Sequence, residues 1–303
     1  MADTYEHIRS GGSGYCEQKR GLIAVWGKEA VQFLDGLISN DMKTLEDGAE
    51  MLAAFPNAQG RLLAVVRVLR QGDRYLFETE EATREKVFQN LFRFTFAGDF
   101  FVEDLSDQYQ FFRLYGEFDL LSIFVLGMST DEPIVFEGRT IDIFVLTATV
   151  DVFRNSLVEL KALLISTELA ETLRIEDGQP VYGIDMDETT IVPELGLDGL
   201  ISYNKGCYIG QEIIARIHFR GHVAKRLTGL MSEPGAIATG FLPGAELTTE
   251  DGKNAGRITS ATYSTKLDKN IALAYVRYDH LASGTELKAG DVSVTVTDLP
   301  FIS

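Results

Sequence analysis

The spacing of apolar residues changes near Arg226, and this change constrains the fold of the chain more than any other feature. Before it, apolar residues recur at helical spacing over 30–38, after a short apolar run at 21–26. The first part therefore predicts strand–helix–strand units with α+β layering, and the second predicts a small antiparallel barrel or sandwich. The second prediction rests on short alternating runs between Pro-Gly, Asp-Gly and Ser-Gly turns, at 246–249, 256–261, 271–276 and 292–296.

Helical spacing and strand-like runs of apolar residues also predict further elements. The patterns predict strands at 62–69, 75–78 and 141–146. One helix is expected over 153–164, and the other expected helix buries Val87, Phe88, Leu91 and Phe92. Residues 1–14 close on Ser-Gly-Gly-Ser-Gly, which predicts a flexible lead-in.

Length, composition and charge exclude several classes of protein. The chain has 303 residues, of which 45% are hydrophobic and 24% charged, and this predicts two or three domains. No apolar run reaches about 18 residues and no signal peptide opens the chain, so we expect a cytoplasmic protein without membrane contact. A net charge of -17 disfavours direct binding to nucleic acid. Two cysteines and four histidines predict neither a disulfide framework nor a bound metal.

The octet Lys-Gly-Cys-Tyr-Ile-Gly-Gln-Glu at 205–212 carries the strongest chemical signal. It places Cys207 beside Lys205 and just before a helical pattern, and both a lysine and a helix start, at about residue 209, would lower the pKa of the thiol. The alternative is a small buried cysteine in a tight turn. We expect Gly206 and Gly210 to serve tight backbone geometry rather than ligand contact. The other residues of the motif are Tyr208, Gln211 and Glu212.

Acidic and basic residues are segregated in the same region. Seven acids and no base lie in 176–198, whereas five bases and one acid lie in 205–226. This order suits a ligand with a hydrogen-bond-donating head and an anionic tail, because a carboxylate accepts paired N–H groups and a guanidinium binds carboxylates. The alternative is a solvated acidic loop followed by a solvated basic helix face.

The stretch from Leu173 to Leu227 resembles the YgfZ family, whose hallmark is a Lys-Gly-Cys-[Tyr/Phe]-x-Gly-Gln-Glu run. The wider superfamily is that of the glycine-cleavage T-protein, an aminomethyltransferase that uses tetrahydrofolate. Weaker resemblance covers 20–41 and 256–276. The resemblance implies an α+β fold with three domains around a central folate site. It implies a folate-binding domain at 1–48 plus 107–226, an inserted α+β domain at 49–106 and a C-terminal antiparallel β-barrel at 227–303.

The same resemblance implies a set of ligand-binding residues. Tyr182 matches a tyrosine that lines the folate pocket, and Glu188 matches a glutamate at the pterin. Arg226 matches an arginine near the folate, while Asp185 and Arg220 join the set from the neighbouring acidic and basic runs. An aromatic side chain packed in a turn is the alternative for Tyr182.

One departure from the T-protein pattern bears on activity. T-proteins carry paired aspartates in the strand after a Gln-Gly-type turn, and here Leu63 and Ala64 stand at those positions. Neither side chain can transfer a proton, so glycine-cleavage aminomethyl transfer by that mechanism is not expected.

The resemblance also implies a function. The YgfZ family is linked to the assembly or repair of iron–sulfur clusters in other enzymes, including tRNA-modifying ones, with folate dependence. It implies that this protein binds tetrahydrofolate or a one-carbon derivative and serves iron–sulfur client or assembly proteins, with Cys207 and Lys205 as the reactive pair. Two alternatives remain, a folate-dependent aminomethyl- or methyltransferase and an interaction scaffold stabilised by folate.

Overall fold

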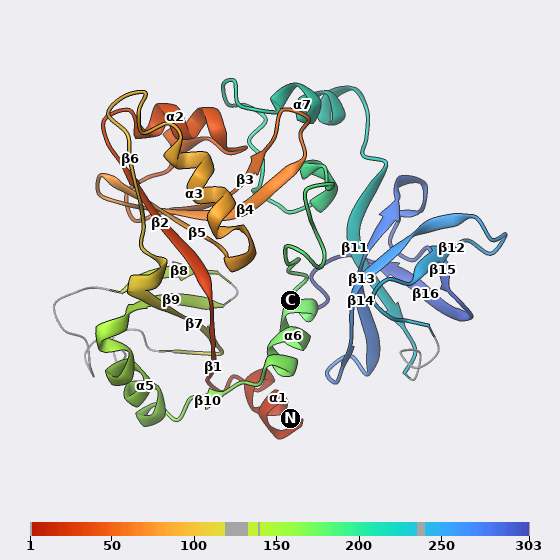
Figure 1. Cartoon of the computed structure of the whole chain (residues 1–303). Coiled ribbons are helices and arrows are strands. Elements are labelled where there is room, and N and C mark those ends of the chain that lie inside the picture. The colour runs from red at the N-terminus through yellow and green to blue at the C-terminus, as the bar shows by residue number, and fades with distance from the viewer. Residues whose placement is uncertain (1, 119–132, 139, 235–239, 303) are drawn as a thin grey trace. The chain divides into compact units, whose positions relative to one another are not determined.

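A computed structural model describes residues 2–118, 133–138, 140–234 and 240–302 (Figure 1). The chain forms two compact units, each built from separate segments. The first unit contains Met1–Ala30, Glu46–Glu50 and Arg67–Ala170, and the second contains Val31–Leu45, Met51–Val66 and Glu171–Ser303.

The elements that the structure describes up to residue 164 are mainly strands, with helices between them. One five-stranded sheet has the order β10-β1-β7-β9-β8 and another has the order β3-β4-β5-β2-β6. The helices are α1 (Ala2–Arg9), α2 (Ala30–Leu37), α3 (Arg84–Phe92) and α5 (Val150–Glu159). The strands are β1 (Gly14–Gln18), β2 (Arg20–Trp26), β3 (Glu50–Pro56), β4 (Leu62–Gln71), β5 (Arg74–Glu80), β6 (Phe101–Asp104), β7 (Tyr109–Tyr115), β8 (Ile134–Glu137), β9 (Ile141–Leu146) and β10 (Leu163–Leu164).

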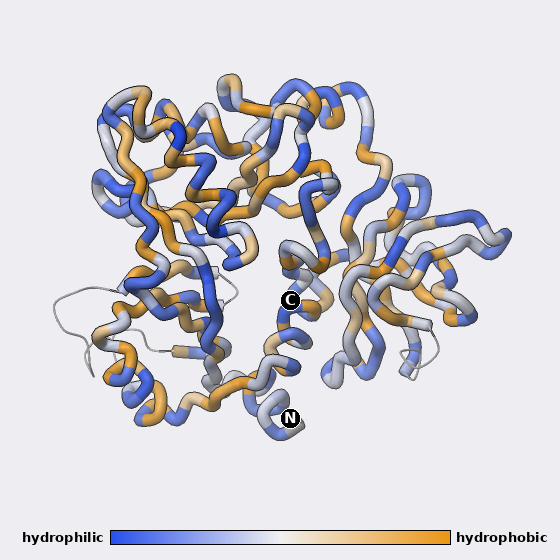
Figure 2. The backbone as a smooth tube through the Cα atoms, viewed as in Figure 1, coloured by the Kyte–Doolittle hydropathy of each residue, from blue (hydrophilic) through white to orange (hydrophobic). Residues whose placement is uncertain are grey.

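Both faces of the β7–β9 pair are buried, which is why these strands are apolar at nearly every position. On one face Phe112 packs against Phe153 of helix α5, with ring centroids 4.7 Å apart. On the other face Phe111 and Phe144 join a cluster with residues of β2, β5 and β8. Figure 2 shows hydrophobic and hydrophilic residues interleaved along α5, as expected for a helix that buries one side.

A buried charge cluster lies within the first unit. The carboxylate of Asp142 is fully buried and accepts hydrogen bonds from Arg113 and Arg67, and Arg67 also pairs with Glu78. Burial alone would raise the pKa of Glu78, but the Arg20 and Arg67 guanidinium groups hold it below its usual value. The cluster therefore keeps its charges through mutual pairing.

The second unit contains a closed barrel with strand order β11-β14-β13-β12-β15-β16. Its interior is apolar because alternate residues point inward, among them Ala272, Ala274 and Val276 of β14. The remaining helices are α6 (Thr167–Glu176) and α7 (Gln211–Arg220). The barrel strands are β11 (Lys225–Ser232), β12 (Glu246–Thr248), β13 (Asn254–Ser264), β14 (Lys269–Arg277), β15 (Glu286–Ala289) and β16 (Val292–Thr297).

The α+β class and the C-terminal barrel are confirmed, and three local expectations are wrong. The lead-in contains helix α1, which buries Tyr5 and Ile8, three residues apart on one face. The helix expected over 153–164 ends at Glu159, and Leu163–Leu164 instead pairs in parallel with β1. Phe92 is 39% exposed and Phe88 half-buried, because the two rings stack on each other at the side of α3.

Candidate functional site

The loop that carries Cys207 is fastened to the C-terminal end of helix α2. The buried ammonium of Lys205 donates to the backbone carbonyls of Asp35, Ile38 and Asn40 at 2.7, 2.9 and 2.6 Å. The backbone N–H of Ile209 donates to the carbonyl of Gly36 at 3.1 Å. The loop is thus held on both sides of the cysteine.

Lys205 has a structural role in this arrangement. Its three N–H donors are used by the three carbonyls, and its ammonium lies 3.2 Å from the Asp35 carboxylate. Burial lowers the pKa of Lys205. Burial would raise the pKa of Asp35, but a hydrogen bond from Lys43 and the charge of Lys205 hold it below its usual value. The lysine therefore neutralises the buried end of α2, and its donors are directed there.

Cys207 lies at the exposed tip of this loop. Its thiol makes no hydrogen bond with the residues that the structure describes, and Gly206 before it is also exposed. Helix α7 begins at Gln211 rather than at about residue 209, so the thiol is four positions ahead of the first helical residue. The alternative of a buried cysteine is wrong for Cys207 and describes the other cysteine, Cys16.

The remaining motif residues shape the loop and the helix start. Tyr208 is buried, with the Lys205 ammonium 5.1 Å from its ring centroid. Gly210 adopts φ 82°, and a Cβ there would lie 2.4 Å from the carbonyl oxygen of Asn57. The Gln211 side-chain amide donates to the Lys205 carbonyl at 3.4 Å, while Glu212 is exposed. A glycine is required at position 210 by both conformation and space.

The acidic segment forms a tight turn after Tyr182, in which Asp185 is buried whereas Asp187 and Glu188 are exposed. Gly183, at φ 85°, donates to the Met186 carbonyl at 2.7 Å. Tyr182 is half-buried and packs with an apolar cluster that includes Leu195 and Leu200. Glu188 is exposed on the same turn. The tyrosine ring and the glutamate are therefore both placed at the surface of this unit.

Both carboxylate oxygens of Asp185 accept hydrogen bonds from other groups of the protein. Its fully buried carboxylate accepts from Arg174 at 2.7 Å, the Val181 N–H at 3.0 Å, the Thr259 hydroxyl at 2.5 Å and the Ser260 hydroxyl at 2.7 Å. These four donors fill the acceptor capacity of a carboxylate. Asp185 therefore fastens its turn to the barrel, and these contacts leave it no free acceptor for a ligand.

The two arginines of the basic segment remain accessible. Arg226 and Arg220 are exposed, and neither forms an ion pair with a residue that the structure describes. The stem of Arg226 packs on Gly196, where a Cβ would lie 3.0 Å from the arginine Cδ. Leu63 and Ala64 lie in β4, which contains no carboxylate.

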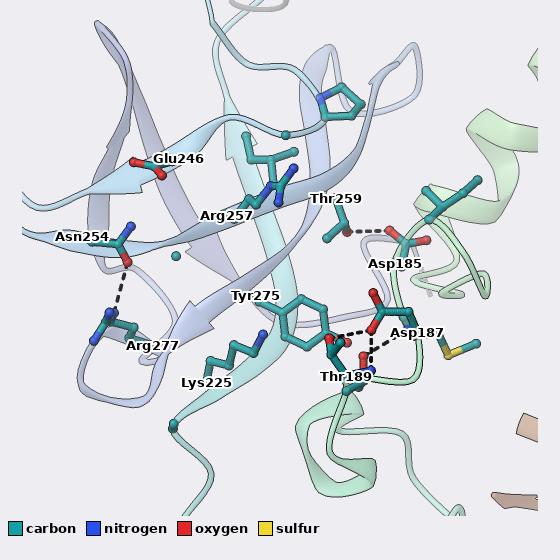
Figure 3. A pocket seen from close by; sticks show the side chains of 18 of the residues that line it. Asp185, Asp187, Thr189, Lys225, Glu246, Asn254, Arg257, Thr259, Tyr275 and Arg277 are labelled. Carbon is teal, nitrogen blue, oxygen red and sulfur yellow. Dashed lines mark hydrogen bonds between the residues drawn. The ribbon is translucent and has the colours of Figure 1, made fainter. Parts of the chain in front are cut away.

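A cavity that the sequence patterns did not indicate lies between the acidic turn and the outer face of the barrel (Figure 3). Its volume is about 810 Å³, and Tyr275 lies in its wall beside Lys225 and Arg257. The only sequence signal was the alternation of β13 and β14, which turns Arg257, Tyr275 and Arg277 away from the barrel interior.

The part of the chain that the structure describes has neither a candidate membrane-spanning helix nor a candidate metal-binding cluster. No helix there combines the length and the apolar character needed to cross a bilayer. No group of three or more histidine, cysteine, aspartate or glutamate side chains is arranged there to hold a metal ion.

Comparisons with known proteins relate the whole chain to one fold. Residues 225–302 match the family of the glycine cleavage T-protein C-terminal barrel domain. An aminomethyltransferase of Rubrobacter xylanophilus is 28% identical over 294 residues, covering 90% of this chain and 78% of that protein. The mitochondrial iron–sulfur cluster assembly factor IBA57 homologue of Mycosarcoma maydis is 27% identical over 235 residues, covering 70% of this chain and 55% of that protein.

The crystal structure of glycine cleavage system aminomethyltransferase T from Bartonella henselae superposes with a TM-score of 0.85 at 20% identity, covering 99% of this chain and 89% of that one. The chain therefore has the aminomethyltransferase fold, contains a barrel domain of the glycine cleavage T-protein type, and is similar in sequence both to aminomethyltransferases and to an iron–sulfur cluster assembly factor.

Proposed function

We propose that this protein binds tetrahydrofolate or a one-carbon derivative of it and acts in the assembly or repair of iron–sulfur clusters in client enzymes. Its reactive group is Cys207. The observation that carries the proposal is the exposed thiol on a loop that Lys205 and Ile209 fasten to α2. A thiol presented in this way is accessible to a macromolecular partner and has the ligand chemistry that iron and sulfur transfer need.

The second unit presents side chains whose chemistry suits a folate. The half-buried ring of Tyr182 offers a stacking surface, and the exposed carboxylate of Glu188 can accept the paired N–H groups of a pterin. The exposed guanidinium groups of Arg226 and Arg220 can bind the carboxylates of the glutamyl tail. Asp185 is omitted from this set because its acceptors are filled.

The two cysteines provide a matched pair of variants for the main test. In cells that lack the protein, Cys207→Ser should fail to restore the activity of iron–sulfur enzymes, including tRNA-modifying ones, while Cys16→Ser should restore it. Cys16 is buried, and burial raises the pKa of its thiol. Both variants should bind tetrahydrofolate as the unaltered protein does. Restoration by Cys207→Ser would remove the thiol from the mechanism.

Folate binding is tested separately by calorimetric titration. Glu188→Gln should weaken tetrahydrofolate binding roughly tenfold or more, because it loses one partner of a charge-assisted hydrogen bond. The matched control is Glu250→Gln, which changes another exposed carboxylate in a barrel turn and should bind normally. Equal affinities for the two variants would exclude Glu188 from the folate site.

A folate-dependent aminomethyltransferase is the second candidate, and the similarity to aminomethyltransferases favours it. Against it, β4 offers the apolar Leu63 and Ala64 where T-proteins carry aspartates, so no acid or base is supplied at that point. We expect the purified protein to fail in aminomethyl exchange with lipoyl carrier protein and tetrahydrofolate. Robust exchange would make the transferase the better assignment.

A further inference from the structure

The cavity on the outer face of the barrel is separate from the residues proposed for folate. Its lining comes from the acidic turn and from strands β11 to β14, and it includes none of Tyr182, Glu188 and Arg226. Its volume of about 810 Å³ lies in the range of small-molecule sites in proteins. The cavity is therefore large enough for a ligand of its own.

A buried hydroxyl without a partner lies in the cavity wall. Tyr275 is 7% exposed, and its hydroxyl makes no hydrogen bond with the described residues. Burial raises the pKa of Tyr275; the neighbouring Thr190 hydroxyl opposes this rise but does not meet hydrogen-bond geometry. The phenol is thus a neutral donor in a place where an unsatisfied polar group costs stability, and a ligand acceptor would satisfy it.

Charges of both signs surround this hydroxyl without pairing. Glu246, Arg257 and Tyr275 are neighbours across β12, β13 and β14, so their side chains form one row on the outer face of the barrel. Lys225 lies on the other side of the tyrosine, with its ammonium 4.6 Å from the ring centroid (Figure 3). Asp187 lies on the facing turn. Within the described residues, none of these four charged side chains forms an ion pair.

Asp187 is fixed in its ionised form. Hydrogen bonds from the Thr189 hydroxyl and backbone N–H at 2.6 and 2.8 Å lower its pKa, and the charge of Lys225 contributes further. The cavity therefore presents two cations and a phenol donor near two carboxylates. A purely anionic ligand would be repelled by those carboxylates and by the net charge of -17, and a purely cationic one by Lys225 and Arg257.

We propose that this cavity binds a small zwitterion of the short-peptide type, with its carboxylate on Arg257, Lys225 and the Tyr275 hydroxyl and its ammonium on Asp187. The ligand carboxylate then meets two cations and a phenol donor, and the ligand ammonium meets the carboxylate of Asp187, while Glu246 stays beside Arg257. This site does not depend on folate binding or on Cys207.

Three peptides that differ only at their ends test the proposal. Trialanine carries both charges, N-acetyl-trialanine keeps only the carboxylate, and trialanine amide keeps only the ammonium. Titrations followed by nuclear magnetic resonance should show trialanine binding at least about tenfold more tightly than either blocked peptide, because each lost charge-assisted contact costs about that factor. Equal affinities, or no saturable binding of trialanine up to about 10 mM, would overturn the proposal.

Variants then assign each end of the peptide. Arg257→Gln should weaken trialanine about tenfold and leave trialanine amide unchanged, and Tyr275→Phe should act in the same direction. Asp187→Asn should weaken trialanine and leave N-acetyl-trialanine unchanged, since asparagine keeps the oxygen that accepts from Thr189. Arg216→Gln, on the exposed face of α7, is the control. If all variants bind alike, the cavity is not the site; tetrahydrofolate affinity should stay constant throughout.

Discussion

Replacing Lys205 by methionine should lower the free energy of unfolding by about 3 kcal/mol and loosen the loop that presents Cys207. Methionine keeps the length of the stem and removes the ammonium. The carbonyls of Asp35, Ile38 and Asn40 then lose their shared donor, and no other side chain among the residues that the structure describes donates to them.

The magnitude follows from the groups left behind. Breaking a buried ion pair by removing one partner costs about 3–5 kcal/mol, and each buried carbonyl without a donor costs about 1–3 kcal/mol. The carboxylate of Asp35 keeps two hydrogen-bond donors, because it still accepts hydrogen bonds from the Lys43 ammonium at 2.7 Å and from the Met42 N–H at 3.2 Å. Water can also reach carbonyls at the end of a helix, so the lower end of the range applies.

Lys43→Met is the matched control, because Lys43 pairs with the same carboxylate but its side chain is 63% exposed. This control should cost much less stability, since surface ion pairs contribute little. Chemical denaturation measures both variants, and alkylation of Cys207 by iodoacetamide in the native state reports the loop. Unfolding of Lys205→Met at the same denaturant concentration as Lys43→Met would show that the Lys205 ammonium does not stabilise the fold.

Two further predictions concern positions where the structure places strain or unpaired charge. Glu50 is half-buried, its Oε2 has no hydrogen bond among the described residues, and burial raises its pKa from the usual 4.5. The protonated form of Glu50 is therefore favoured in the folded state, and the stability that it contributes is complete below about pH 4.5 and lost as the pH rises through the folded pKa. Glu50→Gln should stabilise the protein at neutral pH but not at about pH 4, and pH-dependent denaturation checks this. Gly210→Ala should destabilise it by about 1–3 kcal/mol in thermal unfolding, because φ 82° and contact with Asn57 both oppose a side chain, whereas Gly206→Ala, with open space around it, should be nearly neutral.

The barrel could be predicted from the sequence because the pattern that marks its strands lies within each strand. Alternation in β14 puts Ala274 and Val276 inside and Tyr275 and Arg277 outside, and two-residue alternation needs no knowledge of distant partners. The parallel pairing of β10 with β1 joins Tyr15 to Leu164 across the unit, and no local pattern marks such a partner. Local spacing therefore extends the predicted helix to residue 164, whereas Leu163–Leu164 forms a two-residue strand in the structure.

The side-chain partners within the candidate site were harder to predict than the fold, for a related reason. The octet indicated a reactive thiol, but the role of Lys205 depends on carbonyls 165 to 170 residues away in sequence. Asp185 likewise looked like a ligand acid because Arg174, Thr259 and Ser260, which fill its acceptors, come from other elements. The chemistry of a side chain can be predicted from the sequence, whereas the hydrogen-bond and ion-pair partners of that side chain are set by tertiary packing.

The placement of Cys207 bears on the choice between a transferase and a maintenance factor. Enzymes that move a one-carbon group exclude water and surround the reacting atoms with fixed donors. The thiol here is exposed, it lies four positions ahead of helix α7, and the ammonium of Lys205 is directed to the end of α2. Hydrogen bonds at Lys205 and Ile209 hold the loop on both sides of Cys207. They fix the position of the sulfur but leave it exposed. That combination suits a reaction completed by a second protein, which would supply the remaining walls of the site when it docks.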